Sequence, residues 1–381
     1  MTATVYHMDA RAKRWSHVDS LPGKLERLLA EKANLKSVVK KGEPVAVKMH
    51  FGSQGAYMII RPALVRRVVD AVRAVGGKPF VCDTVRIKGV DYLDVAAANG
   101  ITPQSVNAPV VLADGLFGMD YVKVEAGPLM PFVPVASAIH DAPAMVVLTH
   151  CKGHVQAGYA GAVKNLAMGC VSGTVREKDL RGKVGRGGMH TMHKGQIRWT
   201  GEGCTFCNEC VEACPLEALT CDEGKKAIVI DAQKCWSCCR CARICPTGAM
   251  KAPDVGEKFQ DALSECAKGV LSTFEKERLL FLNFLLDIQP ECDCMPAADV
   301  PVVQDMGILM SQDPCAVDLA TCDLIEAADP LPGSAYTAEH RKAGLSAWEA
   351  LHGRTGRRHV ELLADFTGYE KAYEVVKLGN S

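Results

Sequence analysis

A repeated cysteine motif constrains the fold of this chain more than any other feature. Residues 204–215 read CTFCNECVEACP and residues 235–246 read CWSCCRCARICP, so both copies follow Cys-x2-Cys-x2-Cys-x3-Cys-Pro. Three cysteines at this spacing wrap a tight turn around one cubane cluster, and the fourth, before proline, ligates the other cluster in two-cluster ferredoxins. The repeat therefore predicts two [4Fe–4S] clusters. The expected ligand sets are Cys204, Cys207, Cys210 and Cys245 for one cluster, and Cys235, Cys238, Cys241 and Cys214 for the other.

The alternative interpretation of this repeat is a structural zinc site. Such sites normally combine two separated Cys-x2-Cys pairs, and they do not need a fourth cysteine before proline in each copy. Cys221 and Cys239 fall outside the repeated spacing, so we expect neither to be a ligand. Trp236 lies inside the second motif and is expected either to shield a cluster from water or to be part of the core.

Composition narrows the class of protein further. The 381 residues include 18 cysteines, and no apolar leader is visible, which favours metal ligation in a reducing, anaerobic cytoplasm over disulfides. Lysine plus arginine equals aspartate plus glutamate at 44 each, which argues against a general nucleic-acid binder. The most apolar stretch, residues 279–288, is too short to span a bilayer.

Outside the repeat, short apolar runs alternate with segments of helical period. This pattern predicts an α/β fold with a mixed or largely parallel sheet covered by helices. Because it resumes after the cysteines, we expect a small α+β ferredoxin-like module, residues 200–252, inserted into a discontinuous α/β domain of residues 1–199 and 253–381. Three consecutive domains are the alternative. The predicted strands are 45–50, 78–84, 109–115, 144–150, 279–288 and 301–307, with a further strand at 227–231 between the two cysteine motifs. The predicted helices are 62–75, 161–168, 258–274, 314–327 and 338–352.

Several predicted strands end in residues with chemically useful side chains. Lys48 and His50 share a face at the end of one strand, and His150 ends another. In open α/β sheets ligands bind outside the carboxyl ends of the strands, so a functional cleft is expected there. Ordinary turn chemistry is the alternative, and we expect it for Asp114. The other polar strand ends are Asp83 and Asp305.

The segment THCKGHVQAGYAGAVKN, residues 149–165, follows one of these strands. Its glycine spacing matches neither the dinucleotide fingerprint nor the Walker loop. His150 and His154 would share a face of a helix, but Gly153 between them disfavours a helix, so a loop is expected. We predict that this cationic loop binds a small anionic ligand. The candidate residues of the cleft are His50, His150, Lys152, His154, Lys164 and Asn165.

A second interpretation gives this cleft an additional metal ion. Cys292 and Cys294, in the segment ECDCMP, could face the same way and bind zinc or iron together with His150 or His154. The alternatives are buried, inert cysteines or a redox-active dithiol.

In their order along the chain, these segments resemble a known family. The segments are KMHFGSQG, VCDT, LADG, HCKGH, GYAGAVKNLAMGC, the cysteine repeat, CDCMP and QDMGILMSQDPCAVDLA. They are similar to the uncharacterised iron–sulfur-centre proteins of domain-of-unknown-function family 362, over roughly residues 40–330. The resemblance implies an α/β domain with an inserted ferredoxin-like module and two [4Fe–4S] clusters, and it supplies no substrate.

Two functions of different class follow from these features. In the first, an electron-transfer protein or oxidoreductase passes single electrons between a redox partner and a ligand or metal site at the strand ends. In the second, a non-enzymatic ferredoxin-like adaptor docks on a partner enzyme and needs no cleft. A third class is a lyase or isomerase in which the clusters are only structural, and no feature of the sequence favours it. The segment HTMH, residues 190–193, is interpreted as an exposed connector before the module.

Overall fold

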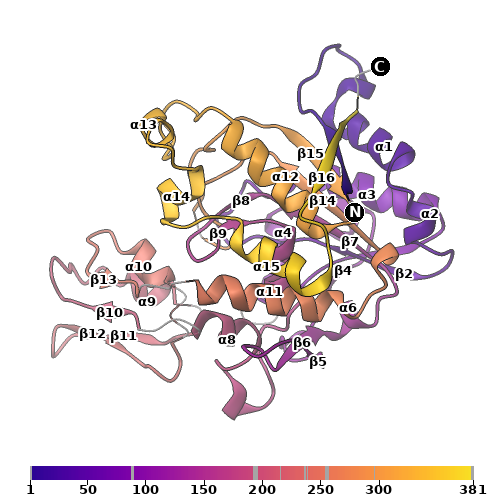
Figure 1. The fold of residues 1–381 in the computed structure, drawn as a ribbon. Coiled ribbons are helices and arrows are strands. Elements are labelled where there is room, and N and C mark those ends of the chain that lie inside the picture. Colours follow the sequence, from indigo (N-terminus) through magenta and orange to yellow (C-terminus); the bar gives the residue numbers. More distant parts are fainter. Residues whose placement is uncertain are drawn as a thin grey trace.

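A computed structural model describes residues 2–86, 90–191, 196–214, 216–235, 237, 239–253, 257–295 and 297–378. An eight-stranded sheet lies at the centre of the molecule (Figure 1). Seven of these strands run in one direction and β15 runs against them, which confirms the mixed, largely parallel sheet. From edge to edge the strands are β16 (Tyr373–Lys377), β1 (Ala3–Met8), β15 (Gly307–Ser311), β14 (Leu279–Leu285), β7 (Met145–His150), β2 (Pro44–Lys48), β3 (Lys78–Asp83) and β4 (Val110–Leu112).

Helices cover both faces of the sheet because its central strands are apolar on both sides. In β2, Val45 and Val47 pack on one face and Ala46 packs on the other. The first face is covered by α1 (Leu21–Glu31), α3 (Pro62–Ala74) and α4 (Asp91–Ala98). The opposite face is covered by α7 (Ala162–Gly169), α11 (Lys258–Leu271), α12 (Pro314–Ala327) and α15 (Arg358–Thr367).

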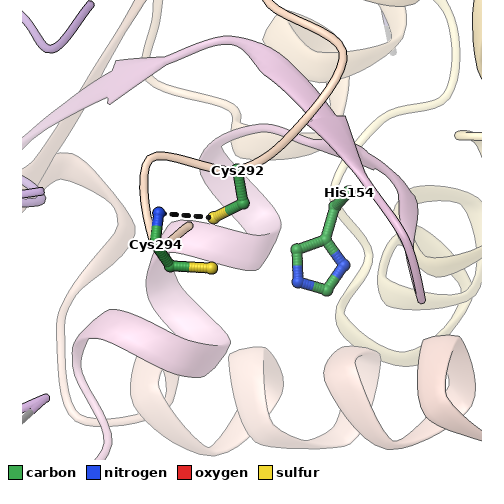
Figure 2. Close-up of side chains that lie close together, drawn as sticks. All are labelled: His154, Cys292 and Cys294. Atoms are coloured by element: carbon green, nitrogen blue, oxygen red, sulfur yellow. Dashed lines mark hydrogen bonds between the residues drawn. The ribbon is translucent and has the colours of Figure 1, made fainter. Parts of the chain in front are cut away.

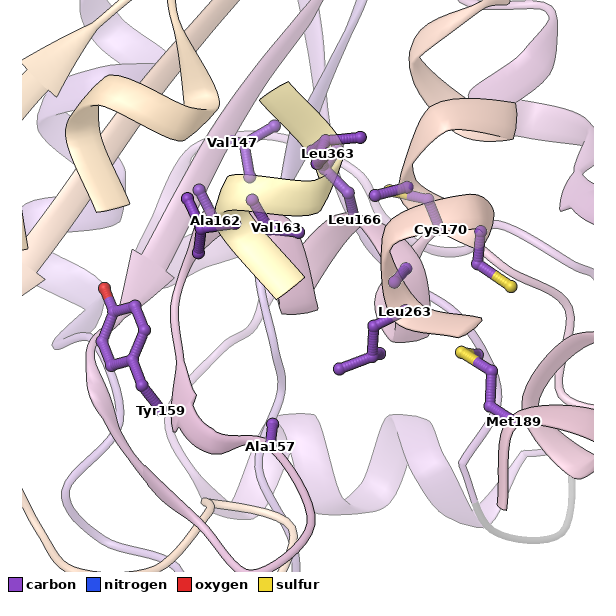
Figure 3. Close-up of a cluster of buried hydrophobic side chains, with 14 of the residues drawn as sticks. Val147, Ala157, Tyr159, Ala162, Val163, Leu166, Cys170, Met189, Leu263 and Leu363 are labelled. Carbon is purple, nitrogen blue, oxygen red and sulfur yellow. The ribbon is translucent and has the colours of Figure 1, made fainter. Parts of the chain in front are cut away.

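Helix α7 packs at the centre of the hydrophobic layer between the sheet and the helices on this opposite face. Figure 3 shows Val163 and Leu166 of α7 among Val147 of β7, Leu263 of α11 and Leu363 of α15, all of them fully buried. Burying a side chain of this size contributes about 1.5–3 kcal/mol. This packing fixes the start of α7, and with it the position of the residues that precede and follow it.

The cysteine-rich segment forms small elements of its own, which project from one side of the molecule (Figure 1). Among the described residues, none of its strands joins the large sheet. The strand expected at residues 227–231 is present as β12. The elements are β10 (Arg198–Trp199), α9 (Glu209–Glu212), β11 (Leu219–Asp222), β12 (Ala227–Ile230), α10 (Arg240–Ile244) and β13 (Met250–Lys251). The exact division into two domains stays a prediction.

Shorter elements complete the described chain. Two hairpins, β5 with β6 and β8 with β9, stand apart from the large sheet. The remaining elements are β5 (Tyr121–Glu125), β6 (Phe132–Ala136), β8 (Lys152–His154), β9 (Gly158–Ala160), α2 (Leu35–Val38), α5 (Pro103–Val106), α6 (Ser137–His140), α8 (Gly185–Thr191), α13 (Ala338–Lys342), α14 (Ala347–His352) and the 3-10 turns His17–Asp19, Lys178–Leu180 and Lys276–Arg278.

Two of the predicted elements do not form as expected, and one pair of strands was missed. The strand expected at residues 301–307 begins where that segment ends, as β15, so Asp305 precedes a strand and its carboxylate accepts a hydrogen bond from the Asp287 amide. The helix expected at 338–352 is two helices, because Gly344 has a φ of +77° and Ser346 caps a new start. Strands β1 and β16, at one edge of the sheet, were not predicted at all.

Candidate functional site

A cavity of about 550 Å³ lies at the carboxyl ends of the central strands. From β2 the sheet extends one way through β3 and β4, and the other way through β7 and β14. The cavity therefore lies at the point where the strand order reverses, which is where open α/β sheets bind ligands. All the α/β candidates from the sequence line it, namely His50, His150, Lys152, His154, Lys164, Asn165, Cys292 and Cys294.

Asp83 organises one wall of the cavity from the end of β3. Its carboxylate forms an ion pair with Lys48 at 2.9 Å and accepts hydrogen bonds from His50 Nδ1 at 2.9 Å and from the Tyr92 hydroxyl at 2.6 Å. Burial alone would raise the pKa of Asp83, but Lys48 and His50 hold it well below its usual range. Asp83 is therefore an anion that fixes the ring of His50.

His50 lines the cavity and has one ring nitrogen without a hydrogen-bond partner among the described residues. Because Nδ1 is bound to Asp83, the lone pair of the neutral ring is on Nε2, and this buried atom has no hydrogen-bond partner among the described residues. Burial lowers the pKa of His50, against the opposing effect of Asp83. The ring can accept a proton, donate one after protonation, or bind a ligand atom.

Residues 149–165 form a hairpin and not the loop expected from the sequence. Strand β7 ends at His150, and β8 and β9 pair before α7 begins at Ala162. Gly153 permits this path, because a Cβ there would lie 1.9 Å from the carbonyl oxygen of Pro290. The Gly153 amide also donates to the carbonyl of Gln289 at 3.0 Å. The hairpin thus lies directly against the segment that contains Cys292 and Cys294.

His150 and Lys152 hold that cysteine segment through Asp293. The Asp293 carboxylate contacts His150 Nδ1 at 2.9 Å, Lys152 Nζ at 2.6 Å and Gln289 Nε2 at 2.6 Å. His150 Nε2 faces the carbonyl of Leu286 at 2.9 Å, so both ring nitrogens of His150 are engaged. Against the effect of burial, His150 and Lys152 hold the pKa of Asp293 well below its usual range. His150 therefore positions the segment and has no free nitrogen to offer a ligand.

His154, Cys292 and Cys294 converge in the cavity (Figure 2). One donor atom from each lies within 4.8 Å of those of the other two, and the imidazole faces the two thiols. The hydrogen bond with Cys294, together with Lys164 and Lys152, lowers the pKa of Cys292 well below its ordinary value. The same hydrogen bond and burial raise the pKa of Cys294. Burial, with Lys164 next, lowers the pKa of His154, so its ring is neutral.

The cavity wall is predominantly cationic. Lys164 Nζ lies 3.2 Å from Cys292 Sγ, and Arg186 bonds to the carbonyls of Met168 and Val85. Asn165 accepts from Lys48 at 2.9 Å and donates to the Leu148 carbonyl, so its amide is a support and not a free group. The charged lining residues are Arg86, Lys152, Lys164, Arg181, Arg186 and Arg240 against Asp83 and Glu291.

Four cysteines of the repeat surround a second, much smaller cavity. Cys204, Cys207, Cys210 and Cys245 line a space of about 20 Å³ with apolar side chains that include Trp199 and Phe206. These are the four residues that the sequence assigns to one cluster. Their convergence on one apolar space fits a four-thiolate ligand set.

The other predicted ligand set lies partly outside the described residues. Cys214, Cys235 and Cys241 are described, and the first two receive backbone N–H···S contacts of 3.3 Å from Ala218 and Ser237. The predictions made for Cys238, Trp236 and His193 fall on residues outside the described part. Cys221 lies in β11 and Cys239 precedes α10, and their exclusion as ligands stays a prediction.

This cysteine set is close to the large cavity. Leu216, two residues after Cys214, and Arg240, one residue before Cys241, both line it. Arg243 of α10 also forms an ion pair with Glu291, the neighbour of Cys292. His190, which was interpreted as part of an exposed connector, instead lines the cavity and bonds Gln156 at 2.6 Å.

Some residues of the site carry no signal in the sequence. Arg86, Arg181 and Arg186 come from segments without periodicity or motif, and only the fold places them in the cavity. Asp293 could have been suspected, since an acidic residue between two candidate thiolates is unfavourable unless cations neutralise it. Asp114 was expected to serve only local turn chemistry, but its carboxylate accepts hydrogen bonds from the amides of Val85 and Gly173, which are distant in the chain.

The fold and the site define a class of α/β protein in which a cysteine-rich segment contributes side chains to a cationic cavity at the strand ends. The chain matches the family described as Domain of unknown function (DUF362) over residues 45–323, and it belongs to that family. Among the described residues, no helix has the length and apolar character needed to cross a membrane.

Curated relatives match parts of the chain. A thylakoid-associated protein of Synechocystis is 29% identical over 41% of this chain and 48% of its own length. The indolepyruvate oxidoreductase subunit IorA of Pyrococcus horikoshii is 39% identical over 15% of this chain and 9% of its own. An uncharacterized ferredoxin of Methanocaldococcus jannaschii is 44% identical over 12% of this chain and 71% of its own. With the cysteine repeat, the ferredoxin and oxidoreductase matches indicate an iron–sulfur redox protein.

A solved structure resembles the chain only distantly. The lactate racemase apoprotein from Thermoanaerobacterium thermosaccharolyticum covers 100% of this chain and 84% of its own, with 10% sequence identity and a TM-score of 0.43. At this distance the likeness says nothing about the site.

Proposed function

We propose that this protein is an oxidoreductase that passes single electrons between a redox partner and a small anionic ligand bound in the large cavity. The observation that carries the proposal is the cavity wall, because the strand-end residues His50 and His150 line the same cavity as Leu216 and Arg240 from the cysteine-rich segment. A redox group held by Cys214 and Cys241 would lie next to the bound ligand.

Two [4Fe–4S] clusters, when bound, would supply one-electron transfer between the surface of the module and the cavity. The convergence of Cys204, Cys207, Cys210 and Cys245 on one apolar space supports the first of them. A cytoplasmic, anaerobic setting is part of the proposal, because 18 cysteines in one chain stay reduced under those conditions.

His50 is the group that we assign to proton transfer. His50 lines the cavity, its buried Nε2 has no partner among the described residues, and Asp83 fixes the opposite nitrogen. A histidine oriented by a buried carboxylate can donate a proton to a ligand as electrons arrive, or remove one in the reverse direction. Lys48 keeps Asp83 charged, so the ring keeps its orientation.

The excess of basic side chains in the cavity wall favours a negatively charged ligand. Six lysine and arginine residues line the cavity against two acidic ones. Lys152 is paired with Asp293, Asp83 with Lys48 and Glu291 with Arg243, so the other five basic residues are in excess. A carboxylate or oxyanion of small size is therefore the substrate class that we propose. Lys164 is the cation that we place nearest to it, beside Cys292.

The non-enzymatic adaptor remains the competing function. An adaptor needs a docking surface and no internal cavity. A cavity of about 550 Å³ with an unpaired histidine nitrogen favours the oxidoreductase.

A reoxidation experiment tests the proposal. The anaerobically reconstituted protein is reduced, mixed in a stopped-flow instrument with a panel of small carboxylates and oxyanions, and followed by cluster absorbance. We expect one class of anion to reoxidise the wild type, and we expect Lys164→Met to slow this roughly tenfold or more through the loss of a charge-assisted contact. Lys41→Met, an exposed lysine outside the cavity, is the matched control. No reoxidation by any anion, with normal electron exchange with a ferredoxin, would favour the adaptor.

A further inference from the structure

We propose that His154, Cys292 and Cys294 bind a divalent transition-metal ion with one coordination position open to the large cavity. The three side chains come from β8 and from the segment after β14, more than 130 positions apart along the chain. Their donor atoms lie within 4.8 Å of one another, and all three line the cavity. This goes beyond the proposed function, because it depends on three side chains and not on electron transfer.

The donor set defines the class of metal. Two thiolates and one imidazole form the Cys2His set that catalytic zinc sites use, whereas magnesium and calcium prefer oxygen ligands. With zinc–sulfur bonds of about 2.3 Å and zinc–nitrogen bonds of about 2.0 Å, donors of a tetrahedral site lie roughly 3.5–3.8 Å apart. The three donors, now within 4.8 Å of one another, therefore need to close by at most about 1.0–1.3 Å, which side-chain rotation can supply.

The fourth position is what makes this a candidate reactive centre. Among the described residues, no other histidine, cysteine or carboxylate completes the group. A structural zinc site normally has four protein ligands, and a catalytic one has three and an exchangeable fourth. The open position would face the cationic cavity, where an anionic ligand could coordinate the ion directly.

The surroundings hold the donors in place. Asp293, between the two cysteines, is fixed by His150, Lys152 and Gln289. The Cys294 amide donates to Cys292 Sγ at 3.4 Å (Figure 2). Hydrogen bonds that orient the ligands and offset thiolate charge are the usual supports of a metal site.

One contact offers a competing explanation. His154 Nδ1 accepts from the amides of Gln156 and Ala157 at 3.2 and 3.1 Å. In that tautomer Nε2 carries the proton and would donate to the sulfurs. Metal binding through Nε2 requires this proton to move to Nδ1, with loss of the two amide contacts, and binding through Nδ1 requires a half-turn of the ring. The competing explanation is a hydrogen-bonded dithiol that binds no metal.

Metal analysis distinguishes the two explanations without any activity assay. The protein is reconstituted anaerobically with iron and sulfide, incubated with zinc chloride, desalted and analysed by mass spectrometry for both metals. We expect about one zinc per chain in addition to the cluster iron, and a zinc K-edge spectrum fitted by two sulfur ligands and lighter donors. Zinc well below one equivalent in the wild type would overturn the proposal.

Variants locate the ion. The Cys292→Ser/Cys294→Ser double variant is expected to lose the zinc and keep the iron, whereas Cys221→Ser, which alters a cysteine of β11, is expected to keep both. If the double variant also loses iron, the metal content of His154→Gln is measured instead. Loss of zinc with full iron content in that variant supports the site. Zinc retained in His154→Gln or in the double variant would overturn the assignment.

Discussion

Asp293 has a larger role than its place between two cysteines suggests. It is 1% exposed and is neutralised by His150 and Lys152, with a further hydrogen bond from Gln289. Removing one partner of a buried charge pair leaves the other charges uncompensated, which costs far more than the net value of the pair. The cysteine segment therefore depends on this one carboxylate for its position.

Asp293→Asn should lower the stability of the reconstituted protein by about 3 kcal/mol, because buried Lys152 loses its counter-ion and His150 loses the carboxylate that its ring contacts. Anaerobic thermal unfolding measures the effect as a fall of several degrees in Tm. Asp287→Asn is the control, since Asp287 pairs with the half-exposed Arg61, and it should cost less than about 1 kcal/mol. Equal shifts in the two variants would contradict the assigned role.

His359, unlike Asp293, is a buried polar side chain that lacks hydrogen-bond partners among the described residues. It is fully buried, and neither ring nitrogen has a partner among the described residues. Burial, with a contribution from Lys164, lowers the pKa of His359 to about 3. An unfolded histidine titrates near 6.5, so below that pH the unfolded state binds a proton that the folded state refuses.

The stability contributed by neutral His359 should thus be complete above about pH 6.5 and fall by about 1.4 kcal/mol per pH unit as the pH drops towards 3. His359→Leu should flatten this dependence between pH 7 and 5 and should not destabilise the protein at pH 7. Anaerobic unfolding at three pH values measures it, with His140→Gln on the surface as control. A variant with the wild-type slope would show that His359 is not the titrating group.

At the scale of elements, the β8–β9 hairpin connects the sheet to the site. It carries Lys152 and His154, precedes α7 with Lys164, and lies against Pro290 through Gly153. A period-two pattern is hard to detect in three-residue strands interrupted by glycine, so the sequence suggested a loop. The lack of space at Gly153 depends on Pro290, which is distant in the chain, and so it could not be foreseen.

Gly153→Ala should separate the hairpin from the cysteine segment, because the added Cβ would lie 1.9 Å from the Pro290 oxygen. We expect zinc binding to fall at least tenfold and Tm to drop, with the iron content unchanged. Gly224→Ala is the control, since its Cβ would contact the Asp222 carboxylate at an ordinary 3.5 Å. Wild-type zinc affinity in Gly153→Ala would contradict the role of this contact.

Elements were predictable where one local pattern dominates. Helix α12 was predicted with its exact ends, because Asp313 caps it and Pro314 starts it, and β12 lies within the strand expected between the cysteine motifs. Strands β1 and β16 were missed because β1 is mostly half-buried and β16 mostly exposed at the sheet edge, where no strong apolar run marks them. The strand ends gave His50 and His150, but their different roles follow from Asp83 and Asp293, which only the fold brings to them.

At the scale of the whole molecule, the module and the sheet meet at the cavity. The Arg243–Glu291 ion pair joins α10 to the segment of Cys292, and Leu216 and Arg240 complete the cavity wall. The sequence predicted both parts and could not give their contact, since it depends on side chains that carry no motif. Leu216 and Arg240, which are chain neighbours of the predicted ligands Cys214 and Cys241, line the same cavity as His50 and Lys164, and the proposed electron delivery to a bound ligand rests on this shared wall.

An anaerobic crystal structure of the reconstituted protein, with anomalous difference maps at the iron edge, tests the central claim most directly. The account predicts two four-iron clusters, one among Cys204, Cys207, Cys210 and Cys245, and the other held by Cys214, Cys235, Cys238 and Cys241 beside the large cavity. Iron absent from both cysteine sets, or a second cluster separated from the cavity by packed protein, would contradict it.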